Sequence, residues 1–473
     1  MGISDDRPLE LDERPEPEEG DRLGDPVIAF VAVHGIGRQR PGETADAVAD
    51  AFTAACSDVG AEFVEQEATG GSADRAGTLS VGEDTAQVQF VDAWWDGHVT
   101  PPPLGRVLRW MLRVTPFAVL MTIATWMSDL NEASEASPRR QRIPLEVLGI
   151  AAAALALLLT PVLMLALLVI NTVAIWRPNA WPRLTDVVLT TFGDAWLYRS
   201  DELNADVLPR LRNLVEEVRA SADTVILVGH SQGAEIARRI ALDVKVDACV
   251  WVGGALSQLA IVRTLRNSPL LPYVLWLYTL LSPLFFSVVV AKMLQILTQF
   301  VSEMTQGFWS LLRTAQSGAD VDGAMQASDA MFDLAFADLP WMLAFGAFSI
   351  AAVFVLRACA RWPDDIRQTP DCPTLEVKSL ADPVCFGRMD PSSLVRYVPI
   401  RSGGNLWREH IAYFEKPETG TALLETIVAP EIVPAPYQPR FSLWTKAVAL
   451  LLTGALIGGA YLLGAQILNL FGW

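Results

Sequence analysis

Short apolar, β-branched runs alternate along the chain with stretches of helical periodicity. Five such runs are predicted strands, several of them closed by glycine turns: 27–33, 87–95, 224–228, 246–254 and 374–380. Apolar residues recur at helical spacing over 208–218, and 234–242 follows the third strand as another helix. This alternation predicts an α/β fold, a mostly parallel sheet with helices on both faces.

Long uncharged stretches interrupt this pattern at five places: 114–128, 147–176, 267–291, 339–356 and 447–473. A helix needs about 18–20 apolar residues to cross a bilayer, and all but the first stretch reach that length. The first reaches it if Arg109 and Arg113 snorkel and 107–126 acts as one span, with a buried or interfacial helix as the alternative. One sheet cannot lie on both sides of a bilayer, so each insertion must cross an even number of times, which favours five spans.

Together these patterns predict one sheet domain that is interrupted by transmembrane helical hairpins. The predicted division is a disordered acidic tail (1–25), core segments 26–96, 181–255 and 366–440, hairpins 97–180 and 256–365, the second with a polar far-side segment, and a C-terminal transmembrane helix (441–473). The tail holds ten acidic residues interleaved with proline and shows no apolar periodicity. It lacks the basic start and apolar stretch of a secretory signal peptide.

Composition narrows the class of protein. With 51% hydrophobic and 19% charged residues, the 473-residue chain is not a disordered protein. Its net charge of −18 argues against DNA or RNA as a partner. The five cysteines are scattered and never spaced as CxxC, so neither a disulfide framework nor a zinc site is predicted. No phosphate loop, HExxH or Asp-rich metal loop is present, so the sequence indicates no metal and no cofactor.

The strongest chemical signal is the segment TVILV-GHSQG-AEIARRIAL at 224–242. It places Ser231 in Gly-x-Ser-x-Gly between a strand and a helix, the context of a nucleophile elbow, with His230 at the variable position. Gly229 and Gly233 are expected because a Cβ would clash in so tight a turn. The alternative is a glycine turn with an ordinary N-cap serine. A catalytic serine needs a base, normally an imidazole oriented by a carboxylate.

With this motif the chain resembles the lipase and esterase branch of the α/β-hydrolase superfamily, over roughly 25–96, 181–255 and 366–435. The resemblance implies the order serine, acid, histidine. Of four histidines, His410 alone follows the elbow and is the predicted base, unless it is a packing or surface residue. The acid expected after the strand at 374–380 is Asp382, with Asp390 as runner-up; Asp382 otherwise caps a turn before Pro383.

The turn after the first predicted strand, HGIG at 34–37, resembles the oxyanion loop of the same family. The resemblance implies that the backbone N–H groups of Gln232 and of Ile36 or Gly35 stabilise the oxyanion. His34 and Gly37 then belong to the turn itself, and a plain glycine turn is the alternative. His98, where the first insertion leaves the sheet, and His230 are assigned no catalytic role.

Orientation and substrate follow from the insertions. Basic residues near the predicted span ends number eleven on the side of the sheet domain (Arg106, Arg109, Arg113, Arg177, Arg183, Arg263, Arg266, Arg357, Arg361, Arg440 and Lys446) and five on the other (Arg139, Arg140, Arg142, Lys292 and Arg313). This bias predicts a cytoplasmic domain of a multi-pass membrane protein.

Both insertions begin just after strands, at the sheet edge where α/β proteins bind ligands, so the site should face the bilayer. The resulting hypothesis is a membrane-embedded serine hydrolase that cleaves an ester, with a membrane lipid as the expected substrate and the bilayer as partner. The alternatives are a serine peptidase or acyltransferase with the same triad, or a non-catalytic membrane scaffold.

Overall fold

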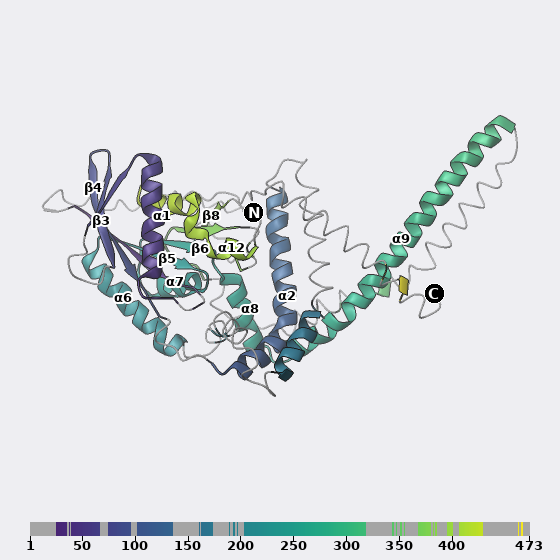
Figure 1. The fold of residues 1–473 in the computed structure, drawn as a ribbon, viewed down its shortest axis with the longest axis horizontal. Coiled ribbons are helices and arrows are strands. Elements are labelled where there is room, and N and C mark those ends of the chain that lie inside the picture. Colours follow the sequence, from purple (N-terminus) through teal and green to yellow (C-terminus); the bar gives the residue numbers. More distant parts are fainter. Residues whose placement is uncertain are drawn as a thin grey trace, which may run out of the picture.

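A computed structural model of the chain shows one eight-stranded sheet flanked by helices (Figure 1). It describes residues 25–66 except 36 and 38, 74–95, 102–135, 160–173 except 161, 203–317, 368–379, 395–400, 406–428, and the isolated positions 189, 193, 196, 343, 344, 347, 351, 354, 382, 384, 385, 462, 465 and 466. Several side chains within the helices at 104–135, 271–317 and 406–411 are not described. The predicted tail 1–25 lies outside the described residues, apart from its last position.

The strand order across the sheet is β2-β3-β4-β1-β5-β6-β7-β8. The strands are β1 Val27–Val33, β2 Glu62–Gln66, β3 Arg75–Val81, β4 Asp84–Asp92, β5 Thr224–His230, β6 Ala248–Val252, β7 Thr374–Lys378 and β8 Val395–Pro399. From β4 through β1 and β5 to β8 all pairings are parallel. β3 runs antiparallel to both β2 and β4. The predicted α/β class, a mostly parallel sheet, is confirmed.

The five predicted strands correspond to β1, β4, β5, β6 and β7, with ends shifted by a few residues. The antiparallel pair β2–β3 and the edge strand β8 were not predicted. β3 and β4 form a hairpin in which Val81 pairs with Asp84 across the two-residue turn Gly82–Glu83, and Gly82 has a φ of 64°. Such a turn favours glycine at its first central position because that residue takes a positive φ.

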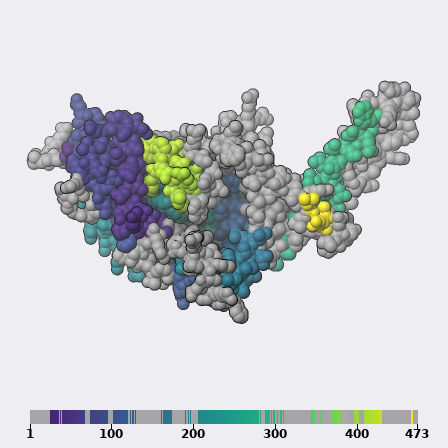
Figure 2. Space-filling view, viewed as in Figure 1, coloured from purple at the N-terminus to yellow at the C-terminus, as the bar shows by residue number. Residues whose placement is uncertain are grey.

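Helices cover both faces of the sheet and bury two apolar cores. The helices of this layer are α1 Glu43–Val59, α6 Leu208–Ser221, α7 Gln232–Asp243 and α13 Pro417–Val428, with the short α12 Leu406–Ile411 before α13. Side chains of α1 and α13 pack on one face, and those of α6 and α7 pack on the other. Figure 2 shows the yellow-green residues of α13 beside the purple ones of α1. Parallel strands buried on both faces explain the continuous apolar runs of β1 and β5.

Three further helices extend the molecule away from the sheet: α2 Leu104–Glu135, α8 Leu256–Asn267 and α9 Leu271–Ser317. α2 follows β4 and α8 follows β6, so these helices leave the sheet within the two predicted insertions. A third apolar cluster joins them, with Leu108 and Met111 of α2 packed among Ile261 and Leu265 of α8 and Leu275 of α9. From this junction the long α9 projects outward (Figure 1).

The predicted membrane spans gain no support from this arrangement. In the described part of the chain, no helix is both long enough and apolar enough to cross a bilayer. The runs 147–176, 339–356 and 447–473 lie mostly outside the described residues. The membrane segments therefore stay a prediction.

A buried ion pair fastens α2 to the sheet. The Lys378 Nζ at the end of β7 lies 3.1 Å from Asp129 Oδ2 of α2, and the two side chains are 2% and 3% exposed. Burial alone would lower the pKa of Lys378, but the carboxylates of Asp129 and Glu376 outweigh it, so that the pKa is raised and the ammonium keeps its charge. This contact joins residues 249 positions apart in the sequence.

Lys378→Met should strongly destabilise the fold, because it leaves the carboxylate of Asp129 buried without this ammonium. Breaking a buried pair in this way costs about 3–5 kcal/mol. Circular dichroism of the full chain should show a clear fall in Tm. The double variant Lys378→Met, Asp129→Leu should regain part of the loss, since neither member of the pair then carries a buried charge, although the buried carboxylate of Glu376 still lacks the ammonium.

The control is Arg40→Met, which removes the exposed pair of Arg40 with Glu43, whose atoms lie 3.9 Å apart. Exposed pairs contribute about 0–1 kcal/mol, so the Tm should change little. Equal Tm changes in Lys378→Met and Arg40→Met would contradict a structural role for the buried pair.

Candidate active site

Ser231 occupies a strained turn between β5 and α7. Its backbone has φ 55° and ψ −120°, and it is the one non-glycine residue with positive φ in the described part of the chain. The Ser231 N–H donates to the carbonyl of Val252 at 3.0 Å, and the Ser231 carbonyl accepts from the N–H of Ala255 at 3.0 Å. Two backbone hydrogen bonds, one with the last residue of β6 and one with the loop after it, thus hold Ser231 in a conformation that costs about 1–3 kcal/mol.

Glycines surround Ser231 because the backbones there leave no room for side chains. A Cβ at Gly229 would lie 2.5 Å from the Ala234 Cα, and one at Gly233 would collide with the carbonyl oxygen of Val33. A Cβ at Gly35 would lie 2.6 Å from the Ser231 Cβ. The loop after β1 therefore packs directly on the elbow, and a Cβ at Gly229 or Gly233 would clash as expected.

His410 links Ser231 to Asp382. The distance from His410 Nε2 to Ser231 Oγ is 2.9 Å, and that from His410 Nδ1 to Asp382 Oδ2 is 2.8 Å. In the tautomer that satisfies both contacts, Ser231 donates to Nε2 and Nδ1–H donates to the carboxylate. Ser231 and Asp382 are buried, whereas 19% of the His410 side chain is exposed. Three residues predicted from sequence, from three distant segments, thus form one hydrogen-bonded chain.

Tyr413 forms a hydrogen bond with the Asp382 carboxylate of this arrangement. Its hydroxyl donates to Asp382 Oδ2 at 3.0 Å and accepts from the N–H of Ser379 at 3.0 Å, while the N–H of Val384 donates to Asp382 Oδ1 at 2.9 Å. Burial, followed by the charges of its neighbours, raises the pKa of Tyr413 well above its usual value, so the hydroxyl remains a donor. A Cβ at Gly253, which has φ 54°, would lie 2.5 Å from the Tyr413 ring. Sequence reasoning missed this tyrosine.

His230 contacts His410, the central residue of this arrangement. Its Nε2 lies 3.0 Å from the carbonyl oxygen of His410, and the two rings stack with centroids 5.3 Å apart. Burial, followed by the charge of His410, lowers the pKa of His230 from 6.5 to about 4. Near neutral pH the ring is therefore uncharged, and its Nε2–H donates to His410. Sequence analysis gave His230 no catalytic role; in the structure it holds the backbone of His410, which makes it a candidate positioning residue.

The predicted oxyanion turn is described only in part. Gln232 is the first residue of α7, so its N–H has no acceptor within the helix. Gly35 lies against Ser231, Gly37 has φ 112°, and Ile36 lies outside the described residues.

His34 is held by its surroundings. Its Nε2 accepts the backbone N–H of Trp95 at 3.1 Å, so Nδ1 carries the proton and donates to the Gly35 carbonyl at 2.9 Å. The ring also stacks on the Trp95 indole with centroids 4.7 Å apart. These contacts fit the expected place of His34 in the turn.

The remaining candidate residues form no second functional site within the described part of the chain. Asp390 and His98 lie outside them. Within them, no group of three or more His, Cys, Asp and Glu side chains is arranged to hold a metal ion. Cys56, Cys249, Cys372 and Cys385 are free thiols.

Substituting His230 tests its positioning role. His230→Phe removes the donor to the His410 carbonyl and should slow the reaction of Ser231 with a fluorophosphonate probe, whereas His230→Gln, which retains an N–H donor, should restore most of the rate. A merely space-filling residue would give the opposite ranking, because phenylalanine fills the ring volume better than glutamine.

The same substitution should change the pH dependence of stability. Between pH 6.5 and about 4 the unfolded chain binds a proton at His230 that the folded chain does not, so stability falls as the pH falls. This loss amounts to as much as about 3 kcal/mol at pH 4. The Tm of His230→Phe should therefore fall less steeply than that of the parent over this range. Parallel Tm curves would contradict the low pKa.

Comparison with known proteins provides no relative from which a role could be transferred. The chain matches no family model, no curated protein and no solved structure. The resemblance to the lipase and esterase branch of the α/β-hydrolases therefore rests on this chain's own residues, the glycine-flanked Ser231 at a strand-to-helix turn and its contacts with His410 and Asp382.

Proposed function

We propose that the protein is a serine hydrolase of the α/β-hydrolase type that cleaves an ester through an acyl-enzyme intermediate. The observation that carries the proposal is the hydrogen-bonded chain Ser231–His410–Asp382, with its serine in a strained conformation between a parallel strand and a helix. A serine that only capped α7 would need neither the strain nor an imidazole at 2.9 Å.

In the proposed reaction, His410 Nε2 removes the Ser231 proton as Oγ attacks the ester carbonyl carbon. The imidazolium that forms is stabilised by Asp382, whose two oxygens accept from Val384 and Tyr413 as well as from His410. Collapse of the tetrahedral intermediate breaks the bond to the alcohol oxygen, which takes the proton from Nε2. Water, deprotonated by His410, then attacks the acyl-serine, and release of the acid restores the free Ser231 hydroxyl.

Negative charge develops on the carbonyl oxygen during both halves of the reaction. The N–H of Gln232, at the positive end of α7, is the proposed first donor, and the N–H of Gly35 or Ile36 is the second. The closeness of Gly35 to Ser231 supports this placement for the turn after β1. Loss of one such donor typically lowers kcat about 10²–10³-fold.

For the substrate we propose a lipid ester that reaches Ser231 from a membrane, with the sheet domain on the cytoplasmic side. Support comes from the composition and from large apolar side chains that remain exposed beyond the sheet: on α9, Leu277, Leu297, Val301 and Trp309 are 60%, 54%, 54% and 56% exposed. Single exposed apolar residues are ordinary, so the support lies in four of them occurring on one helix together with the apolar composition.

Labelling with a fluorophosphonate probe tests the catalytic assignment. Ser231→Ala should abolish labelling, because the alanine has no oxygen to phosphonylate. His410→Ala should slow labelling at least about 10²-fold, the usual size of general-base assistance. The matched control Ser221→Ala removes a serine at the end of α6 and should label like the parent. Undiminished labelling of Ser231→Ala, or no labelling of the folded parent, would falsify the assignment.

Reconstitution tests the substrate class. In liposomes the full chain should cleave phospholipid or acylglycerol analogues with higher kcat/KM than short p-nitrophenyl esters, since membrane-borne substrate is concentrated at the site. The lipid assignment is wrong if short esters react equally well in detergent and in liposomes while no membrane lipid is cleaved. Faster cleavage of amides than of esters would indicate a peptidase instead.

A further inference from the structure

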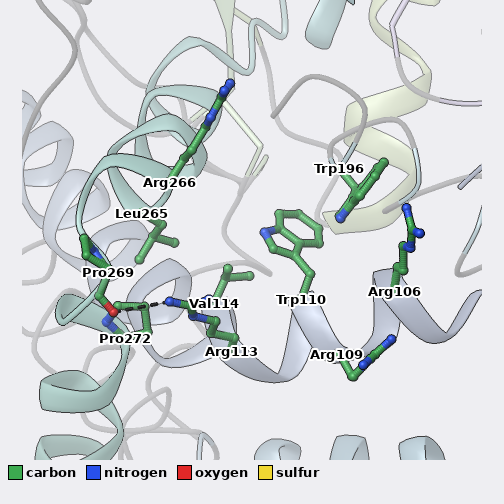
Figure 3. A pocket seen from close by; sticks show the side chains of 10 residues that line it. All are labelled: Arg106, Arg109, Trp110, Arg113, Val114, Trp196, Leu265, Arg266, Pro269 and Pro272. Carbon is green, nitrogen blue, oxygen red and sulfur yellow. Dashed lines mark hydrogen bonds between the residues drawn. The ribbon is translucent and has the colours of Figure 1, made fainter. Parts of the chain in front are cut away.

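A cavity of about 510 Å³ lies where α2 passes the junction of α8 and α9 (Figure 3). It is lined by Arg106, Arg109, Trp110, Arg113, Val114, Trp196, Leu265, Arg266, Pro269 and Pro272. Trp110, Val114 and Leu265 are buried, whereas the four arginines are exposed. The cavity thus has an apolar interior and a cationic rim, and its volume is typical of small-molecule sites.

The arginines of α2 are concentrated on one side of the helix. Arg106, Arg109 and Arg113 are spaced by three and four residues, so like charges lie next to each other, an arrangement that destabilises a helix. The hydrogen bonds described for Arg109 and Arg113 are to backbone carbonyl oxygens. In the part of the chain that the structure describes, none of these three arginines forms an ion pair with a carboxylate. An anion in the cavity would compensate the repulsion.

Trp110 gives an independent indication of a ligand. Its side chain is 7% exposed, and its indole Nε1 is buried without a hydrogen-bond partner among the described residues. Figure 3 shows the Trp110 ring between Arg113 and Trp196, with its nitrogen edge turned toward the space beside Leu265. A buried N–H donor left unpaired costs about 1–3 kcal/mol, and a ligand oxygen would satisfy it.

We propose that this pocket binds a phosphate group, carried by an anionic phospholipid headgroup or by free phosphate. Guanidinium groups bind phosphate through paired, charge-assisted hydrogen bonds, and a set of them around one cavity suits a tetrahedral oxyanion. Apolar side chains beside the rim fit the lipid source: Leu270, Tyr273 and Leu277 are 65%, 63% and 60% exposed. Basic pockets between helices at a membrane surface are a known type of lipid site.

This pocket is separate from the catalytic serine. The N-terminal end of α8 touches the elbow, where the N–H of Ala255 donates to the Ser231 carbonyl. Arg266 lies ten residues along α8 from Leu256, a rise of about 15 Å. In a phospholipid only a few single bonds of about 1.5 Å each join the phosphate to the nearest ester carbonyl. We therefore infer that a lipid whose headgroup fills this pocket is not the one under attack, and the proposal does not rest on catalysis.

Ligand-induced changes in Tm test the proposal. The full chain carrying Ser231→Ala, which prevents turnover, is titrated in neutral detergent with dihexanoylphosphatidylglycerol, with dihexanoylphosphatidylcholine and with inorganic phosphate. Phosphatidylglycerol should raise the Tm. Arg109→Gln with Arg113→Gln should increase the half-saturating concentration at least about tenfold, since two charged hydrogen-bonding groups are lost. Trp110→Phe should weaken binding by a smaller factor.

The matched control is Arg210→Gln with Lys245→Gln, which removes two exposed positive charges elsewhere and should leave half-saturation unchanged. Equal shifts from phosphatidylglycerol and inorganic phosphate support the pocket with free phosphate as its ligand, and a larger shift from phosphatidylglycerol supports the headgroup. The proposal is overturned by no shift with either ligand, by equal half-saturation in the pocket and control variants, or by an equal shift from phosphatidylcholine, whose choline cation the arginines would repel.

Discussion

The candidate site depends on one steric constraint, the absence of space for any Cβ where β1, β5 and α7 meet. Gly35, Gly229 and Gly233 each approach backbone or Ser231 atoms so closely that a methyl group would overlap them. In this crowded turn Ser231 adopts a positive φ, and hydrogen bonds with Val252 and Ala255 hold its peptide groups. Packing of the sheet therefore provides the energy that keeps the hydroxyl aimed at His410.

His410 and Asp382, the proposed base and acid, are held by a second set of contacts, which comes from the chain beyond β7. Asp382 follows the end of that strand, and His410 and Tyr413 lie in the short helical segment that leads to α13. One tyrosine hydroxyl connects the strand end, through the N–H of Ser379, with the carboxylate. His230, which directly precedes Ser231, donates a hydrogen bond to the His410 carbonyl. The hydrogen-bonded arrangement of Ser231, His410 and Asp382 is thus an outcome of tertiary packing, since Ser231 and His410 are 179 residues apart.

Sequence analysis predicted the features that are determined by residues close together in the chain. β1 and β5 are buried on both faces and so read as continuous apolar runs, and the elbow is recognisable because its glycines are required within five residues. β2 was missed because four of its five residues are exposed and show no alternation, and the hairpin of β3 and β4 had only Gly82 as a signal. Tyr413 and the Lys378–Asp129 pair depend on contacts between distant segments, which no local pattern encodes.

The net charge of a protein governs the electrostatic field that a ligand experiences only at long range. The acidic total of −18 predicted repulsion of phosphate-bearing partners, yet four arginines share one cavity. At physiological salt, charges are screened beyond about 8 Å, so a ligand in that cavity experiences the arginines and little of the acidic remainder. α8 runs from the elbow to this cavity, and α2 is tied to α8 through Thr122 and Gln258, 3.0 Å apart. If the proposed anionic lipid binds there, we expect it to orient the edge of the sheet that holds Ser231 relative to the membrane that contains the lipid.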